Sequence, residues 1–445
     1  MTIQSYTNVM AGKEFAFSIS EYLYVSQKKE IQRSHFYNLM VAESRDRGAE
    51  KHMVIYASFL SNGGLGDCKI EFIILILVVD GFAQTKFDVI LKVVEELGLN
   101  IQNMVGIATD GDSSMLLVPH LISTHCIAHT ESLALLDACK NFPCFSYIDK
   151  IANRVYSWTH GSSVRHRNFQ KLLEEMNLQA LEVLQIHDVR WLSRGKVMER
   201  LVVLMPTILT FWKIDATCWY EKLRIFKVLF LIHFIAHVLH ELNELNCHFQ
   251  EENVDMCSAK INQVFHWILV QVMSIVVKQQ QKNLLFSAIF YSKESKKSKT
   301  SRVRESKVKE WLEKLIDRVG DSLIVPKSCR EEIFSFVDTL YYACEGMSMK
   351  DSWKVLSSNI NWHSTYSIIL KLWQIVLVLA VSSVACERGF SKQNLIKTSM
   401  RQSLKVKTLD MLMRISLNGP NLSEMDWVEI HKIWELQKCR KFVDV

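Results

Sequence analysis

The chain has 445 residues, of which 49% are hydrophobic and 22% are charged. This apolar fraction is ample for a buried core and excludes wholesale disorder. At roughly 150 residues per domain, the length allows about two to four structural units. With 5 prolines and 15 glycines the chain has few residues for tight turns. The composition therefore argues against an all-β sandwich and favours a helix-rich fold with some sheet.

The charge balance restricts the partners that the chain can have. There are 53 basic and 47 acidic residues, a formal charge of +6, which permits contact with DNA without requiring it. The 11 cysteines lack the dense spacing of a secreted disulfide scaffold, so we expect free thiols in a reducing compartment. No signal peptide is visible at the N-terminus. The apolar stretches Val228–Leu239 and Ile375–Val384 are shorter than the ~20 residues of a membrane helix, so no membrane contact is expected.

The first quarter of the chain predicts a sheet. Phe36–Val41 and Met53–Leu60 are short runs rich in apolar, β-branched and aromatic residues. Ile70–Val79 is almost continuously apolar, as expected for a strand that is buried on both faces. Between the last two lies Ser61–Cys68 (SNGGLGDC), whose residues are typical of a hairpin turn. Its glycines do not have the spacing of a phosphate-binding loop.

Helical patterns dominate the rest of the chain. Phe87–Leu97 has helical spacing, and Met104–Ala108 then predicts a fourth strand. From about Tyr147 to Asn283, apolar residues recur at steps of three and four. Tyr291–Lys309 carries eight basic residues against two glutamates, and five serines. We interpret it as a solvated linker, with a phosphate-binding strip or a nuclear targeting signal as the alternative.

Several longer motifs follow one another in a fixed order. They are GIATDGDSSM at Gly106–Met115, LISTHCIAH at Leu121–His129, IHDVRWLS at Ile186–Ser193, LNELNCHFQEENVDM at Leu242–Met256, and SSVACERGFSKQNLIKTSMRQSL at Ser382–Leu404, continuing to LDMLMRISLNGP at Leu409–Pro420. In this order they resemble motifs of hAT-superfamily DNA transposases: the second catalytic block with its CxxH pair, the RW motif, the helical insertion and the C-terminal dimerisation block. The resemblance runs from Phe36 to Trp434, which is most of the chain.

The resemblance implies an α-rich α/β fold, in which an RNase H-like mixed sheet is interrupted by a large all-helical insertion and followed by C-terminal dimerisation helices. We expect a helical or irregular N-terminal segment at 1–34 and the first part of the RNase H-like core at 35–190. The helical insertion domain is expected at 191–365, with a basic loop at 291–309. The last part of the core and the dimerisation region are expected at 366–445.

Such enzymes place three carboxylates around divalent metal. Hard oxygen ligands hold Mg²⁺ or Mn²⁺ and neutralise charge on the attacking and leaving oxygens of a phosphodiester. The resemblance places the second carboxylate at Asp110, at the end of a strand, where a helix N-cap is the alternative role. It places the third at Glu387, which is costly to bury on a mostly apolar helix unless the carboxylate is paired or metal-bound. Pairing with Arg388 or another local cation is the alternative role.

The first carboxylate is missing, because the expected aspartate at the end of the first strand is Ala42. Glu43 should point to the opposite face of the strand, and Asp46 lies beyond its expected end. We therefore predict an incomplete metal site in which Asp110 and Glu387 are remnants. No cofactor is expected, and Mg²⁺ or Mn²⁺ would bind only if the degenerate site still held metal.

Two ligands of a further site are visible in the CxxH pair, Cys126 and His129. Cys139 and Cys144 would complete a four-ligand zinc set, but structural zinc sites usually have tighter paired spacing. We favour buried packing of the CxxH pair near the active-site region.

Aromatic and histidine residues of the helical part have two possible roles each. In the family, the tryptophan of the RW motif, here Arg190 and Trp191, stacks near the processed DNA end, and anchoring of a helix start is the alternative. His233, His237 and His240 share one helical face and are too spread to meet at one ion. We expect them to be partly buried histidines of a core helix.

The C-terminal block carries the predicted dimerisation residues. Leu409, Leu412, Met413 and Leu417 are spaced three and four apart on one helical face, and packing inside their own domain is the alternative. The resulting hypothesis is a transposon-derived, catalytically inactive, nuclear or nucleocytoplasmic homo-oligomer with weak, non-specific DNA binding and no small-molecule substrate. An active metal-dependent DNA transposase, or an interaction scaffold with no nucleic-acid role, are the alternatives.

Overall fold

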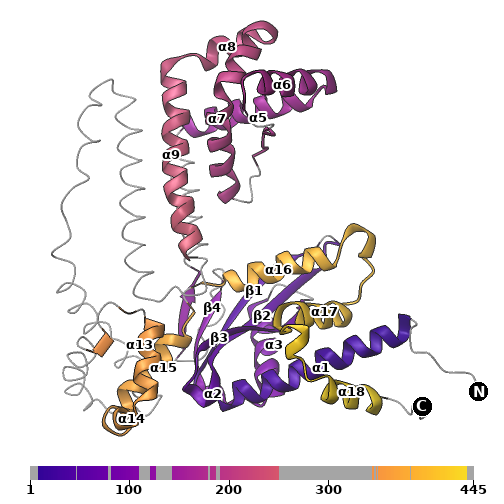
Figure 1. Cartoon of the computed structure of the whole chain (residues 1–445), viewed down its shortest axis with the longest axis vertical. Helices are drawn as coiled ribbons and strands as arrows, with labels where there is room; N and C mark the ends of the chain where they lie inside the picture. The colour runs from indigo at the N-terminus through magenta and orange to yellow at the C-terminus, as the bar shows by residue number, and fades with distance from the viewer. Residues whose placement is uncertain are drawn as a thin grey trace, which may run out of the picture. The chain divides into compact units, whose positions relative to one another are not determined.

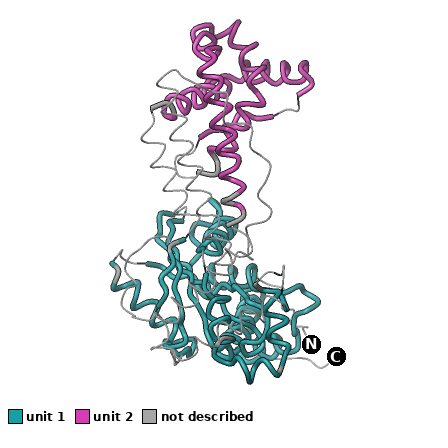
Figure 2. Tube along the Cα trace, turned by 90° about the vertical axis from the view of Figure 1, so that its left-hand side faces the viewer, with its two compact units in different colours: residues 1–126, 255–257, 295–445 teal, residues 127–254, 258–294 magenta. Residues whose placement is uncertain are grey.

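The computed structural model describes residues 9–46, 48–78, 82–109, 121–126, 143–178, 181–186, 191–249, 343–344, 347, 349–380 and 382–437. The chain divides into two compact units, which Figure 2 shows in different colours. Unit 1 comprises residues 1–126, 255–257 and 295–445, and unit 2 comprises residues 127–254 and 258–294. The basic loop 291–309 lies outside the described residues.

Unit 1 contains a mixed five-stranded sheet with the order β3-β2-β1-β4-β5 (Figure 1). Its strands are β1 (Tyr37–Arg45), β2 (Lys51–Leu60), β3 (Cys68–Leu77), β4 (Met104–Thr109) and β5 (Ile122–His125). β2 is antiparallel to both β1 and β3, whereas β4 is parallel to both β1 and β5. The first four strands are the predicted ones. β5 was not predicted, because four residues within the CxxH block are too few for a periodic pattern.

The β2–β3 connection is the predicted hairpin turn. Leu60 and Cys68 are paired at the ends of the two strands. Between them, α2 (Ser61–Gly64) is a short turn in which Asn62 and Gly63 have φ angles of 50° and 66°. These left-handed conformations suit asparagine and glycine, which explains why the SNGG sequence reverses the chain here.

Helices cover both faces of the sheet, and the side chains of β1 alternate between the two. On one face, Leu39 and Val41 share a core with side chains of α1 (Val9–Arg33) and α3 (Ala83–Glu96). On the other, Met40 and Ala42 share a core with side chains of α16 (Val384–Ile396) and α17 (Val406–Asn418). The prediction of an α-rich α/β fold is confirmed for this unit.

Side chains of α17 bond to the backbone of β3, which is an edge strand of the sheet. Unpaired edge groups invite pairing with other chains, so edge strands are commonly covered. The residues that cover this edge are Asn418, Asp410 and Arg414. Their bonds run between Asn418 and the Phe72 amide (3.1 Å) and carbonyl (2.7 Å), from the Leu75 amide to Asp410 (2.8 Å), and from Arg414 to the Ile73 carbonyl (2.7 Å).

The remaining helices of unit 1 are α13 (Met349–Ser358), α14 (Ile360–Thr365), α15 (Ser367–Val378) and α18 (Trp427–Leu436). Short 3-10 turns occur at Ile101–Asn103, Ser399–Arg401 and Leu422–Glu424. α13 and α15 build a second core with the ends of the strands, in which Trp353 and Ile375 are buried. α18 packs on α1, where the ring of Phe15 stacks on Trp427 at 6.2 Å.

Unit 2 is mainly helical in its described residues, as predicted, and the segment 181–186 is not helical. It contains α5 (Pro143–His160), α6 (Ser163–Glu175), α7 (Trp191–Asp215), α8 (Thr217–Leu223) and α9 (Phe226–Phe249). One continuous apolar core joins these helices. Its centre includes the fully buried side chains of Val155, Leu204 and Ile232.

Among the described helices, α9 is the one that is long and apolar enough, by length and composition, to cross a membrane. Its buried side, which includes Ile232, Ile235 and Leu239, belongs to the core that α9 shares with α7. His233 and His237 are exposed on the other side, so the prediction that they are partly buried was wrong. Their apolar sequence neighbours point elsewhere, because successive helical residues are rotated by about 100°.

Candidate functional site

β1 carries an alanine where the family resemblance expects an aspartate, at Ala42, three residues before the strand ends at Arg45. Ala42 pairs with Val54 of β2, and Val41 pairs with Thr109, the last residue of β4. Val41 and Thr109 are the last paired residues of β1 and β4, the two strands that should carry the first two carboxylates. Ala42 is the next residue of β1 after this pair. It is 6% exposed and lies in an apolar core. Its methyl group offers no ligand atom, and Asp110 lies outside the described residues.

Glu43 is held on the face of the sheet opposite Ala42, as the alternation of a strand requires. Its carboxylate forms ion pairs with Lys51 of β2 and with Lys86 of α3, the latter at 2.9 Å. The Lys86 side chain is 9% exposed, so this pair is largely desolvated. Glu43 is therefore bound to two cations away from the Ala42 face and does not replace the missing ligand.

Asp46 forms a buried ion pair with Lys397, the residue that follows α16. Its side chain is 1% exposed, and the Lys397 ammonium donates to it at 2.5 Å. The same ammonium donates to Glu50 at 2.8 Å. The backbone amides of Gly48 and Glu50 donate to the other oxygen of Asp46, at 2.8 and 2.9 Å. Burial alone would raise the pKa of Asp46, but Lys397 and the Glu50 amide outweigh it and lower that pKa.

A neutral histidine completes this cluster. His52 is fully buried, and its Nδ1 accepts a hydrogen bond from Gln393 of α16 at 3.0 Å. Nδ1 also lies 3.7 Å from the Asp46 carboxylate. Burial lowers the pKa of His52, and the nearby Asp46 only partly opposes that shift. The cluster thus contains two carboxylates and a neutral imidazole, and both carboxylates already have a cation in Lys397.

Glu387, the predicted third carboxylate, lies near the start of α16 and is exposed. The residues of α16 that face the sheet are Cys386 and Gly389, because both are buried and Gly389 lies close to the hydroxyl of Tyr56. Glu387 therefore needs no partner to offset burial, and its role as the third carboxylate stays a prediction. The described residues at this face do not fit a three-carboxylate metal centre.

Cys126 lies directly after β5 in unit 1. It is fully buried, and its backbone amide donates to the Thr109 carbonyl at 3.0 Å. Its sulfur lies 3.5 Å from the hydroxyl of Ser382. These contacts agree with the packing role that we favoured. His129 and Cys139 lie outside the described residues and Cys144 lies in the first turn of α5, so the alternative zinc set stays a prediction.

Two family models match the chain. The model described as the FAM200/GTF2IRD2 helical domain matches residues 125–271. The model described as the hAT family C-terminal dimerisation region matches residues 338–418. The chain is a transposase-derived protein of the hAT superfamily. The second match covers α16 and α17, the helices that lie on the Ala42 face of the sheet.

The RW motif of this hAT-derived protein lies at the start of α7. Trp191 is the first residue of that helix, which agrees with a position at a helix start. Arg190 lies outside the described residues. The proposed stacking of Trp191 on DNA stays a prediction.

The predicted dimerisation stripe is divided between the interior and the surface of unit 1. Leu409 and Met413 are fully buried against the sheet. Leu412 and Leu417 are partly exposed. At least half of the stripe therefore packs inside its own domain, which is the alternative that its spacing left open. The most exposed apolar residues among the described part of the matched region are Leu395 and Met400, at 72% and 94%.

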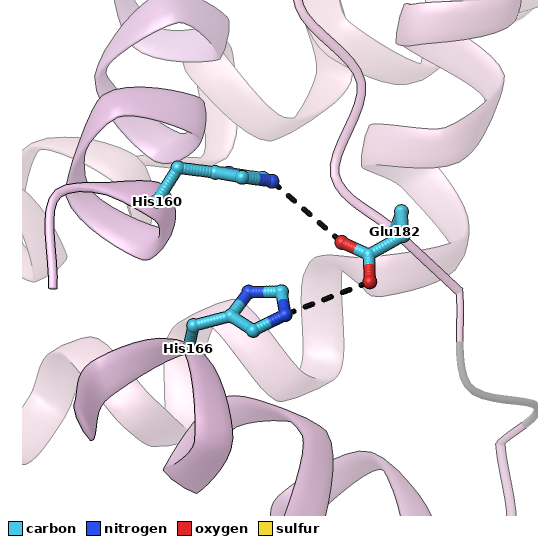
Figure 3. Close-up of side chains that lie close together, drawn as sticks. All are labelled: His160, His166 and Glu182. Carbon is cyan, nitrogen blue, oxygen red and sulfur yellow. Dashed lines mark ion pairs between the residues drawn. The ribbon is translucent and has the colours of Figure 1, made fainter. Parts of the chain in front are cut away.

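Sequence reasoning missed two clusters of polar side chains. One is the buried network of Asp46, Lys397 and His52, which joins residues more than 340 positions apart. The other lies in unit 2, where His160 and His166 face Glu182 (Figure 3). The only signal for the second was the pair of histidines that flank the GSSVR turn, and nothing in their spacing pointed to Glu182.

Proposed function

We propose that this protein is a catalytically inactive descendant of an hAT transposase, which acts in the nucleus as a dimer and contacts DNA weakly and without sequence preference. The observation that carries the proposal of inactivity is Ala42, a buried methyl group on β1 next to the last residue that pairs with β4. The mixed sheet, with a strand parallel to β1 on one side and two antiparallel strands on the other, supports the RNase H-like assignment.

The chemistry of the site explains why one alanine is enough. Phosphodiester cleavage at such a centre needs metal to neutralise charge on the attacking and leaving oxygens. A metal that is held by fewer carboxylates binds more weakly and in a less defined position. The two acidic residues nearest to Ala42 in sequence are ion-paired with lysines, so neither provides the missing oxygen.

The test is a DNA cleavage assay with Mg²⁺ and with Mn²⁺, on the parent chain and on Ala42→Asp. We expect no cleavage above background from the parent chain. Metal-dependent cleavage by the parent that disappears in Asp110→Ala and in Glu387→Ala would overturn the proposal and favour an active transposase.

Ala42→Asn is the matched control, because it is as large as aspartate but carries no charge. Both substitutions disturb a buried position, and the aspartate also buries a carboxylate. If the remaining ligands still converge, Mn²⁺ should raise the unfolding temperature of Ala42→Asp and leave Ala42→Asn unchanged.

DNA contact is proposed from the formal charge of +6 and the basic run within 291–309. Binding to a random duplex should weaken steeply as salt rises, because each phosphate that is neutralised releases a counterion. Deleting the run should lower the slope of log K against log salt. If the chain does not bind DNA even at low salt, the scaffold without a nucleic-acid role becomes the better description.

A further inference from the structure

Three potential metal ligands converge on the surface of unit 2. His160 is the last residue of α5, His166 lies in the first turns of α6, and Glu182 belongs to the extended segment 181–186 that follows α6. Figure 3 shows both imidazole rings directed at the one carboxylate. One ligand atom from each residue lies within 4.8 Å of the other two.

The distances suit ligands of a shared ion better than direct hydrogen bonds. Nε2 of His160 and Nε2 of His166 each lie 3.6 Å from a different oxygen of Glu182. Direct N–H···O hydrogen bonds measure about 2.7–3.2 Å. Two ligands bound to one tetrahedral zinc at about 2.0–2.1 Å are separated by about 3.4 Å. The two nitrogen–oxygen separations of 3.6 Å are therefore close to those between ligand atoms around zinc.

The contacts of His160 are compatible with the tautomer whose Nε2 lone pair points toward Glu182. Nδ1 of His160 lies 3.1 Å from the Tyr156 carbonyl oxygen, and also 3.1 Å from the Thr159 hydroxyl. We assign the Nδ1 proton to the carbonyl, which leaves Nε2 unprotonated in the neutral ring. A backbone carbonyl on the other ring nitrogen is the usual outer partner of a metal-bound histidine. The Tyr156 ring stacks on the imidazole at 4.2 Å and restrains it.

The carboxylate is held in place as well. Arg200 of α7 donates to the backbone carbonyl of Glu182 at 2.9 Å, and Gln170 of α6 donates to its carboxylate at 3.4 Å. The Glu182 side chain is nevertheless 57% exposed, so an ion can reach the cluster from solvent.

We propose that His160, His166 and Glu182 form a Zn²⁺ site with a fourth position open to water. Two imidazoles and one carboxylate are a ligand set that zinc accepts, and imidazole favours zinc over Mg²⁺ or Ca²⁺. The ion would tie the α5–α6 turn to the segment that leads into α7. This role is independent of the remnant catalytic face in unit 1.

A second cluster in the described residues, Asp46, Glu50 and His52, also brings three ligand atoms together. It does not carry the same proposal, because the Lys397 ammonium already lies 2.5 and 2.8 Å from its two carboxylates. The unit 2 cluster has no lysine or arginine ion-paired to Glu182 among the described contacts.

The experiment uses the full chain after removal of metal with a chelator. Zinc alone is added, its affinity is measured by calorimetry, and the unfolding temperature is followed in parallel. At a hundredfold excess of zinc over its Kd we expect a rise of roughly 5–10 °C in the unfolding of unit 2. His166→Gln and Glu182→Gln should each weaken binding at least about tenfold, the loss seen even when only an outer partner of a ligand is removed.

The matched control is His233→Gln with His237→Gln, because these exposed histidines on α9 are one helical turn apart and belong to the same unit. The control should keep both the affinity and the shift in unfolding temperature. All variants are at the surface, so without zinc they should unfold at nearly the parent temperature. The proposal is overturned if zinc does not bind, if the control loses the binding, or if His166→Gln and Glu182→Gln bind zinc like the parent.

Discussion

Replacing Lys397 by methionine should destabilise unit 1 strongly, because it leaves a buried carboxylate without its cation. The side chains of Lys397 and Asp46 are 2% and 1% exposed, and their charged atoms are 2.5 Å apart. Removing one partner of a buried ion pair typically costs about 3–5 kcal/mol. Asp46 keeps hydrogen bonds from two backbone amides, so we expect about 3 kcal/mol, at the lower end of this range.

Hydrogen exchange measured by mass spectrometry reports this loss for unit 1 by itself, through the amides of β1 and β2. A loss of about 3 kcal/mol corresponds to exchange that is on the order of 10²-fold faster where global opening controls the rate. The effect should be present at neutral pH. Because the pKa of Asp46 is lowered in the folded state, the contribution of its charge is lost only as the pH falls below about 4.

Two further variants separate the ion pair from the loss of side-chain packing. Lys397→Met combined with Asp46→Asn removes the unpaired charge but keeps an oxygen for the backbone amides, so much of the stability should return. Lys354→Met is the matched surface control, because the Lys354–Asp67 pair is 3.6 Å long and both side chains are more than half exposed. Its loss should be at most about 1 kcal/mol. Equal losses in Lys397→Met and Lys354→Met would refute this reasoning.

Three other predictions concern unit 1. Burial lowers the pKa of His52, so the parent chain should lose stability as the pH falls below about 6.5, where the unfolded chain takes up the proton. In denaturant titrations, His52→Gln should reduce this dependence of the unfolding free energy on pH. Gly389→Ala should lower the unfolding free energy by about 1–3 kcal/mol in the same titrations, because the new β-carbon would lie 2.8 Å from the Tyr56 hydroxyl of β2. Gly12→Ala on α1 is the control and should be neutral or stabilising, because nothing lies within 4 Å of its β-carbon. The parent chain should be a dimer by light scattering, and the double variant Leu395→Asp with Met400→Asp should be a folded monomer. A parent chain that is already monomeric at micromolar concentration would contradict the proposed dimer.

Most of the sheet was predictable because its strands are short, apolar and separated by clear turn residues. β1 to β4 all begin and end within a few residues of the predicted runs, although β1 extends to Arg45 and therefore brings Glu43 into the ladder. The orientation of Glu43 followed from strand alternation alone. β5 escaped prediction because its four residues lie within a motif that was interpreted as a ligand pair.

The candidate site was only partly predictable, since burial depends on which face of a helix meets the sheet. The apolar surroundings of Glu387 in sequence suggested a buried carboxylate, yet Cys386 and Gly389 occupy the sheet-facing positions. The same reasoning failed for His233 and His237 on α9. The Asp46–Lys397 pair joins the two ends of a long chain, and no local pattern marks such a contact.

The structure also offers a reason why the C-terminal block matches its family model although Ala42 stands where the resemblance expects a catalytic carboxylate. Leu409 and Met413 fill the core beneath the sheet, while Asp410, Arg414 and Asn418 bond the exposed edge of β3. Loss of α17 would therefore leave both an apolar face and an open strand edge, whether or not the chain cleaves DNA. A catalytic aspartate contributes nothing of this kind to folding, because an unpaired buried carboxylate destabilises the fold that contains it. Once cleavage is no longer required, an alanine at position 42 is compatible with the fold, whereas disruption of α17 is not.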